Sequence, residues 1–455
     1  MHSTLSTQRA ARSVSAALAL VLFAASPSLF ALEYELSLQL GVDQSDNIDL
    51  EPAGLEDDET ETSAAAIVRL SQDTKHIDLL MDYVLEQSHY QNDRIENETQ
   101  VQGSTDLEWL VFDETLIWDF RHLITEARVS EREVDTPDTR ETRNVFSTGP
   151  TISARLSGVD RLVLSADYTK VDQETANVEL LGTDVDNARN LDSERTLGRI
   201  SWRRAISQTS SFSIGYSQGV TEFDDDSPDF EYQQVSASYN VLLASGAYGI
   251  ELGFNEAERD GQDDKQDGTF AAISYNNDFG GRTLEFRLIN QLTDSSIGLG
   301  ADGADVTDSN FNIIDIVERT NARIIYGYDA ICRSCDWEVS YEYDKEDFKN
   351  TDQPTVTRVQ DTEEHTLRSV LRYGINSRAT SYVGVGYTRA EFEDENREDD
   401  RYNLNVGLEY KFAERVDFDA GVNYRERDTE RDENEDLDIG YEEFSAYATV
   451  TIKIL

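Results

Sequence analysis

The stretch YNLNVGLEYKFAERVDFDAGVNY, residues 402–424, decides the fold. Apolar and aromatic side chains occupy every second position from Tyr402 to Phe412 and again from Val416 to Tyr424. The positions between them carry Asn, Gly, Glu, Lys or Asp. Successive side chains of a strand point to opposite sides, so a period of two is typical of a strand with one apolar and one polar face. Residues 413–414 then predict a short turn between two such strands.

The same period recurs outward along the chain, for example in residues 336–343 and 248–254, and two kinds of connection separate the strands. One kind is short, at Asp73–Lys75, Phe112–Glu114, Ser157–Asp160, Ser207–Ser210, Ser245–Gly246, Gly280–Gly281, Cys332–Cys335, Gly374–Ala379 and Ala413–Glu414. The other kind is longer and acidic, at Gln44–Glu61, Gln91–Arg94, Arg132–Glu141, Glu174–Leu191, Asp224–Phe230, Asp260–Gln266, Ser295–Ile314, Asn350–Gln360, Glu393–Asp399 and Thr429–Leu437. The two kinds alternate strictly along the chain.

An outer-membrane barrel keeps its short turns on the periplasmic side, whereas a water-soluble sandwich has no reason to place them all at one end. We therefore predict an all-β fold, a transmembrane antiparallel up-and-down β-barrel of about 20 strands over residues 32–455. Eighteen strands are the alternative, because residues 95–146 alternate poorly. Strands and connections account for the mature chain, so we expect no plug domain. A soluble secreted β-protein is a further alternative.

Composition narrows the class of protein. The 455 residues include 91 Asp and Glu against 40 Lys and Arg, a net charge of −51 that excludes a nucleic-acid partner. Mean hydropathy is −0.56, and no apolar run reaches the roughly 18 residues of a membrane-spanning helix. The 21 Tyr and 18 Phe argue against a disordered acidic chain, and two cysteines are too few for a disulfide scaffold.

The first 31 residues have the features of a secretory signal peptide. Arg9 and Arg12 precede an apolar segment, residues 14–23, and small residues lead to Ala31. We predict a signal peptide at residues 1–31 that is cleaved after Ala31, with Ala25 as the alternative. An N-terminal membrane anchor is a poorer explanation, because the apolar segment is too short to span a bilayer. The mature chain is therefore expected to be exported.

Aromatic residues gather near both kinds of connection. Those next to short turns are Trp109, Phe212, Tyr248, Phe279, Trp337, Tyr373, Tyr382 and Phe412. Those near long loops are Tyr90, Phe223, Tyr232, Tyr343, Phe392, Tyr402 and Tyr424. Two outward-facing rings of this kind are the interfacial girdles of a barrel in lipid. The general preference of aromatic residues for strands is the alternative explanation.

The polar face of the strands carries charges of both signs and is expected to line the lumen. The predicted lumen-lining residues are Arg199, Arg203, Glu251, Glu285, Arg287, Glu338, Glu342, Arg368, Arg372, Glu409 and Lys411. Such groups stay hydrated in a wet lumen but would be costly in a dry core. A barrel of this size encloses more volume than side chains fill, which favours a water-filled channel. Residues 174–191 and 295–314 are candidates for loops that fold inward and constrict it.

Acidic residues concentrate in the long loops, where they are expected to bind divalent cations, bridge to lipopolysaccharide phosphates or favour cations at a pore mouth. A solvated surface is the alternative. One cluster follows positions 1, 3, 5, 7 and 12 of a calcium-binding loop, with Leu437 in place of the turn glycine. Its residues, Asp432, Asn434, Asp436, Asp438 and Glu443, form a weak candidate site for Ca²⁺ or Mg²⁺. No other cofactor is expected.

Two further motifs carry reactive side chains. Cys332 and Cys335 flank a short turn, and an oxidising periplasm favours a disulfide between them. His89, beside Ser88 and near Asp93, is the one histidine placed like those of outer-membrane proteases and lipases. No second signature supports catalysis, so we do not expect an enzyme and interpret His89 as a polar lumen or rim residue.

Residues 34–50, YELSLQLGVDQSDNIDL, resemble the first strand and following loop of a family of outer-membrane β-barrel porins. In that family a Gly-aromatic-x-x-Ser/Thr-Asp-Asn stretch follows the first strand. Here Gly41, Ser45, Asp46 and Asn47 match, while Val42 replaces the aromatic residue. The family is often associated with exosortase-linked exopolysaccharide loci, so the resemblance implies a porin-like barrel with polysaccharide export components as partners.

These observations predict a bacterial outer-membrane channel for exopolysaccharide export or small-solute passage. The alternative is a closed structural or adhesive barrel whose acidic loops bind cations or extracellular polymer. The expected partners of the barrel are outer-membrane lipid, lipopolysaccharide and the barrel assembly machinery. The last strand carries Val450, Ile452 and Ile454 in the expected alternation but ends on Leu455 instead of Phe.

Overall fold

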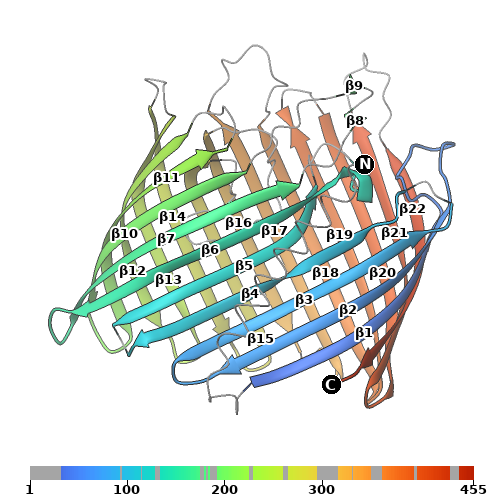
Figure 1. The fold of residues 1–455 in the computed structure, drawn as a ribbon, viewed down its shortest axis with the longest axis horizontal. Coiled ribbons are helices and arrows are strands. Elements are labelled where there is room, and N and C mark those ends of the chain that lie inside the picture. The colour runs from blue at the N-terminus through green and yellow to red at the C-terminus, as the bar shows by residue number, and fades with distance from the viewer. Residues whose placement is uncertain are drawn as a thin grey trace.

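Alternating sequences of this kind form long antiparallel strands, and in a computed structural model the strands close into a barrel (Figure 1). Twenty strands pair in chain order among the residues that the structure describes, and the last pairs with the first from Ser37↔Lys453 to Ser45↔Ser445. Closure leaves no unpaired sheet edge. The prediction of twenty strands is confirmed, and the alternative of eighteen is wrong. The absence of a plug domain stays a prediction.

The structure describes residues 32–92, 95–113, 115–128, 134–174, 179–180, 183–184, 192–224, 229–259, 265–294, 316–329, 331–349, 361–393, 397–430 and 440–455. The predicted signal peptide lies outside these ranges. No helix within them is long and apolar enough to cross a membrane.

The first ten barrel strands are β1 (Leu32–Ser45), β2 (Glu59–Asp73), β3 (Ile77–Tyr90), β4 (Thr99–Phe112), β5 (Leu116–Arg128), β6 (Arg140–Arg155), β7 (Asp160–Glu174), β10 (Ser193–Ala205), β11 (Ser210–Phe223) and β12 (Phe230–Leu242). The other ten are β13 (Gly246–Arg259), β14 (Lys265–Asp278), β15 (Arg282–Asp294), β16 (Ile316–Tyr328), β17 (Cys335–Phe348), β18 (Thr362–Asn376), β19 (Ala379–Phe392), β20 (Arg397–Ala413), β21 (Val416–Glu430) and β22 (Tyr441–Lys453). A two-residue pair, β8 (Glu179–Leu180) and β9 (Thr183–Asp184), and a short 3₁₀ turn, η2 (Pro137–Thr139), lie in connections.

The connections separate into two ends, as predicted from their lengths. The short turns lie at the lower rim of Figure 1 together with the C-terminus, and the long connections lie at the upper rim. In an outer-membrane barrel the short-turn rim is periplasmic and the long-loop rim is extracellular.

Contacts across the polar face show which side of the sheet is concave. Tyr382 of β19 donates a hydrogen bond to Asp419 of β21 at 3.1 Å, and its hydroxyl also meets that of Tyr447 on β22, three strands away. Side chains three strands apart meet on the inside of a barrel. The polar face therefore lines the lumen, and the apolar face, with Leu404 and Phe254 among its exposed side chains, points outward to lipid.

The poor alternation between residues 95 and 146 has a structural cause on the outward face of β3 to β6. Tyr83 hydrogen-bonds to Thr105 at 3.0 Å and to Nδ1 of His122, whose Nε2 is 2.7 Å from Oδ1 of Asn144. The register places all four on the same side as the exposed Leu85. These polar groups satisfy one another where lipid offers no partner, so the strands remain membrane-compatible without an apolar pattern.

Replacing Tyr83 by phenylalanine is expected to lower the free energy of unfolding by about 1–2 kcal/mol, because His122 and Thr105 lose a partner in a lipid environment. Urea unfolding in lipid vesicles, followed by tryptophan fluorescence, measures the change. The control is Tyr239→Phe, since Tyr239 is outward and exposed with no hydrogen bond to another described residue. Equal losses in the two variants would contradict a role for the hydrogen-bonded chain.

Candidate functional site in the barrel lumen

The register puts all of the predicted lumen-lining residues on the inner face of the barrel. Glu342 accepts a hydrogen bond from Asn321 at 3.1 Å, and Glu251 accepts one from Ser236 at 2.5 Å. Glu285 and Arg287 come together on the wall of a pocket of about 280 Å³ that Asn321 also lines. The full set is Arg199, Arg203, Glu251, Glu285, Arg287, Glu338, Glu342, Arg368, Arg372, Glu409 and Lys411.

Charges of opposite sign occupy different walls of the lumen. The inner face of β1 to β4 has a single base, Arg69, and its acids are Glu33, Glu35, Asp43, Glu59, Glu61, Asp73, Asp78, Asp82, Glu86, Asp106 and Glu108. The inner face of β6, β7 and β10 has two described acids, Glu141 and Asp167, and its bases are Arg143, Arg155, Arg161, Arg195, Arg199 and Arg203. Segregated charge of this kind creates a field across the lumen.

Burial of the charges changes along the lumen axis. The buried charged residues all lie within four residues of the extracellular end of a strand: Glu59, Glu141, Arg143, Arg195, Arg259, Glu346, Arg397, Asp399, Arg427 and Glu443. Near the periplasmic rim most of the inner-face charges are exposed, as for Arg203, Arg372, Glu409 and Lys411, and Asp417 and Lys453 are partly exposed. The described inner wall is therefore accessible at its periplasmic end and closely packed at its extracellular rim.

The most deeply buried charge cluster lies at the extracellular ends of β20 and β21. Asp399, which has no exposed surface, accepts hydrogen bonds from Arg397 at 2.7 Å and from Arg427 at 2.6 Å. Thr429 donates a further hydrogen bond to it at 2.9 Å. The guanidinium of Arg397 stacks over the ring of Phe392 on β19, 4.7 Å from its centroid. Two arginines thus donate to one buried carboxylate, and a third, Arg401, lies 3.8 Å from it.

Ion pairs continue this cluster around the rim. Arg401 lies 3.7 Å from Glu364 on β18, and Arg319 of β16 pairs with Asp344 of β17 at 3.0 Å. In the other direction, Arg425 pairs with Glu443, so the paired charges extend from β16 to the last strand. Unlike charges on neighbouring strands stabilise the pairing of those strands.

The described part of the connection between β5 and β6, residues 134–139, carries a charge that lies near other strands. Asp135 in this connection binds Arg140 at 2.9 Å and also acts electrostatically on Arg425 of β21 and Tyr441 of β22, on the far side of β1. Leu50 in the connection between β1 and β2 is 2 % exposed, so that loop is packed as well. Described residues of both connections are therefore packed at the extracellular end of the barrel. The loops proposed from the sequence to constrict the lumen, residues 174–191 and 295–314, lie almost wholly outside the described residues.

Several aromatic side chains predicted for the outward girdles face the lumen instead, and the prediction is wrong for Tyr90, Phe223, Tyr232, Phe392 and Tyr382. Phe223 packs edge-on against Phe230, with ring centroids 5.8 Å apart, and Arg259 lies over the Phe230 ring. Buried arginines at the rim need apolar surface for their planar groups, and the aromatics supply it. The parity of Phe223, opposite to that of its outward neighbours in β11, is the signal that identifies it as inward.

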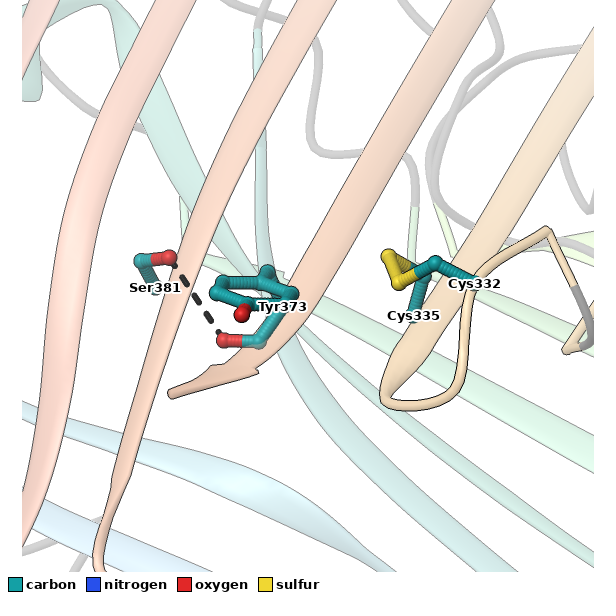
Figure 2. The surroundings of a disulfide bond; sticks show 4 residues. All are labelled: Cys332, Cys335, Tyr373 and Ser381. Carbon is teal, nitrogen blue, oxygen red and sulfur yellow. Dashed lines mark hydrogen bonds between the residues drawn. A yellow bond between two sulfur atoms is a disulfide. The ribbon is translucent and has the colours of Figure 1, made fainter. Parts of the chain in front are cut away.

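The two cysteines lie in the turn between β16 and β17 at the periplasmic rim (Figure 2). Their Sγ atoms are bonded, with 5.1 Å between the Cα atoms of Cys332 and Cys335. Ser334, between them, accepts a hydrogen bond from the backbone of Gly374 at 2.8 Å, and Tyr373 accepts one from Ser381 at 3.5 Å. The disulfide therefore holds a turn that also contacts the next hairpin.

The other sequence-predicted sites do not assemble in the described residues. Glu443 is turned inward, where Ser45 donates a hydrogen bond to it at 2.6 Å, and the remaining members of the cation cluster, Asp432, Asn434, Asp436 and Asp438, lie outside the described ranges. No group of three or more metal-ligating side chains occurs within those ranges. Ser88 points inward and His89 outward, so these two cannot act together, and Asp93 is not described.

The matched residues of the porin-like stretch have a structural role at the barrel seam. Oδ1 of Asp46 accepts a hydrogen bond from the backbone N–H of Phe444 in β22 at 2.7 Å. The side-chain amide of Asn47 donates to the carbonyl oxygens of Glu51 and Glu442 at 2.8 and 2.9 Å. This pair therefore fastens the first long connection to the last strand. The sequence contains this motif, but only the contacts across the seam explain its spacing.

Comparisons with known proteins give one partial family match. Residues 289–449 match the family described as outer membrane protein beta-barrel domain. A search of curated proteins finds no match. Together with the closed barrel, the family match places the chain in the outer membrane, and this predicted location is confirmed.

Several solved structures are similar in fold. The siderophore receptor PirA from Acinetobacter baumannii is 9% identical, with a TM-score of 0.49 over 93% of this chain and 80% of that one. The FrpB iron transporter from Neisseria meningitidis, F3-3 variant, is 10% identical, with a TM-score of 0.48 over 92% and 81%. The loop L8 deletion mutant of OmpT, an outer membrane protein of Vibrio cholerae, is 13% identical, with a TM-score of 0.36 over 92% and 99%.

Proposed function

We propose that this barrel is a channel for small polar solutes, with a wide periplasmic vestibule and a constriction at its extracellular mouth. The observation that carries the proposal is the change in burial of the inner-face charges, from exposed near the short turns to buried near the long loops. Exposed charges on the inner wall favour a water-filled vestibule, because burying them in a dry interior would be costly.

The segregated walls support the same proposal. An acidic wall on β1 to β4 and an arginine-rich wall on β6 to β10 orient dipolar and zwitterionic solutes as they pass. The resemblance of residues 34–50 to a porin family adds exopolysaccharide chains to the solutes worth testing. Under this proposal the acidic loops at the extracellular rim concentrate cations there.

A closed structural or adhesive barrel is the second candidate, and the packed extracellular rim favours it. Ion pairs, the pair of Arg397 and Asp399 fully buried among them, extend from β16 to β22, and Asp135 in the connection between β5 and β6 pairs with Arg140. A barrel sealed in this way would present its loops to cations or polymer without conducting.

Single-channel recording on the refolded mature chain in planar bilayers distinguishes a channel from a closed barrel. We expect discrete current steps, and swelling of proteoliposomes in neutral sugars that declines with sugar size. The double variant Asp135→Ala/Arg140→Ala removes the ion pair that holds the β5–β6 connection to β6 and is expected to increase the conductance. A well-folded, heat-modifiable barrel that gives neither current nor swelling, in wild type and variant alike, would overturn the channel proposal in favour of the closed barrel.

A further inference from the structure

Three arginines stand side by side on the inner face at the periplasmic rim. Arg155 at the end of β6 lies directly opposite Arg161 of β7, and Arg161 lies directly opposite Arg203 of β10. Directly opposed residues of antiparallel strands have Cα atoms about 4.5–5.5 Å apart. All three side chains are exposed toward the lumen. The barrel thus holds three guanidinium groups in one row across three strands.

Arg161 and Arg203 have no acid beside them on the inner face of these strands. The neighbouring inner positions carry Ser153, Val163 and Ser201. Asp160, next to Arg161 in sequence, points to the other face, 3.7 Å from Arg204. Arg161 and Arg203 make no ion pair with any described residue. Like charges directly opposite one another destabilise a sheet, so packing alone gives no reason for the row.

The row also begins a longer basic track. Arg199 and Arg195 follow Arg203 at four-residue intervals on the inner face of β10, which has no acid. Four residues of strand cover about 13 Å, which is the spacing of the three arginines along β10. Although the chain has a net charge of −51, the inner face of β10 carries three arginines and no acid.

We propose that Arg155, Arg161 and Arg203 bind the oxyanion group of a solute at the periplasmic mouth of the lumen. A guanidinium donates two parallel hydrogen bonds to phosphate, sulfate or carboxylate, and three adjacent guanidiniums match a group with several oxygens. The oxyanion relieves the mutual repulsion of Arg161 and Arg203, which lie directly opposite each other. The site does not depend on conduction, because a closed barrel with this row binds the same anion from the periplasmic side.

Isothermal titration of inorganic phosphate into the folded, detergent-solubilised mature chain tests the site. Wild type is expected to bind phosphate with an affinity that falls as sodium chloride is raised, because exposed charges are screened by salt. Arg161→Gln and Arg203→Gln are each expected to weaken binding by at least about tenfold, the loss of one charge-assisted contact. Arg161→Lys keeps the positive charge but loses the two parallel donors of the guanidinium. Its phosphate affinity is expected to lie between that of the glutamine variants and that of wild type.

Arg333→Gln is the matched control, because it removes one positive charge at the same rim, in the turn that carries the disulfide, and is expected to bind like wild type. Thermal unfolding gives an independent readout, since a ligand that binds the folded state raises the midpoint. Phosphate is expected to raise it for wild type and Arg333→Gln but not for Arg161→Gln. Repeating the titration with citrate distinguishes phosphate from carboxylate ligands.

The proposal is overturned if the folded wild type binds none of phosphate, sulfate and citrate, or if Arg161→Gln and Arg203→Gln bind them as wild type does. These results leave the channel proposal standing when the same preparation conducts. Absence of current with phosphate binding intact would refute the channel and retain the site.

Discussion

Replacing Asp399 by alanine is expected to lower the free energy of unfolding of the barrel by roughly 3–5 kcal/mol. Asp399 is fully buried and receives hydrogen bonds from Arg397 and Arg427, which are 4 % and 3 % exposed. Removing the carboxylate leaves two guanidinium groups close together without their shared counter-ion. Because little water reaches them, the cost resembles that of breaking a buried ion pair rather than a surface one.

Urea unfolding in lipid vesicles measures this change, and Glu409→Ala provides the control on the same strand. Glu409 has the same inward orientation but lies exposed near the periplasmic rim, so its loss is expected to change stability by less than about 0.5 kcal/mol. A second variant, Asp399→Asn, keeps an acceptor without the charge and is expected to be intermediate. Similar stability of Asp399→Ala and Glu409→Ala would show that water hydrates the rim arginines.

The barrel itself could be predicted because its determinants are local. The period of two from Tyr402 to Tyr424 requires only that lipid lie on one face and water on the other. The strict alternation of short and long connections then gives the number of strands. The predicted number of strands is correct even where the outward face is polar. There Tyr83 hydrogen-bonds to Thr105 and His122, so these polar side chains have partners in lipid without an apolar pattern.

The extracellular rim could not be predicted, because its structure depends on contacts between residues distant in sequence. Glu443 was interpreted as part of an acidic loop, yet Ser45, 398 positions earlier, donates to it at the barrel seam. Phe392 was assigned to a girdle, but the arginine that it packs against comes from the next strand. Proximity to a loop indicates a level along the barrel axis, and it does not say which face a side chain occupies.

The lumen likewise combines features that the local sequence predicts with features that depend on how the strands are paired. Each predicted lumen-lining residue was identified by its parity, which is local. The grouping of acids on β1 to β4 and arginines on β6 to β10 emerges only when the register aligns the strands. Arg155, Arg161 and Arg203 are scattered over 49 positions of sequence and become neighbours through two separate pairings.

Replacing Asn47 by alanine is expected to cost roughly 3 kcal/mol of unfolding free energy and to loosen the junction of first and last strands. Asn47 has no exposed surface, and its amide joins the carbonyl oxygens of Glu51 and Glu442, while its Oδ1 accepts from the backbone N–H of Glu51 at 2.9 Å. Truncation leaves these backbone groups buried and unpaired. The seam has nine paired positions, fewer than most of the other strand pairings. The loss of these contacts is therefore expected to destabilise the pairing of β1 with β22 strongly.

Heat-modifiable migration on gels and urea unfolding in vesicles measure the change, with Leu55→Ala as the control in the same connection because Leu55 is 62 % exposed. Asn47→Asp separates hydrogen bonding from size. It retains an acceptor for Glu51 but places a carboxylate against two carbonyl oxygens, so it should be at least as destabilising as alanine. If Asn47→Asp were instead as stable as wild type, the amide donors of Asn47 would not hold the seam.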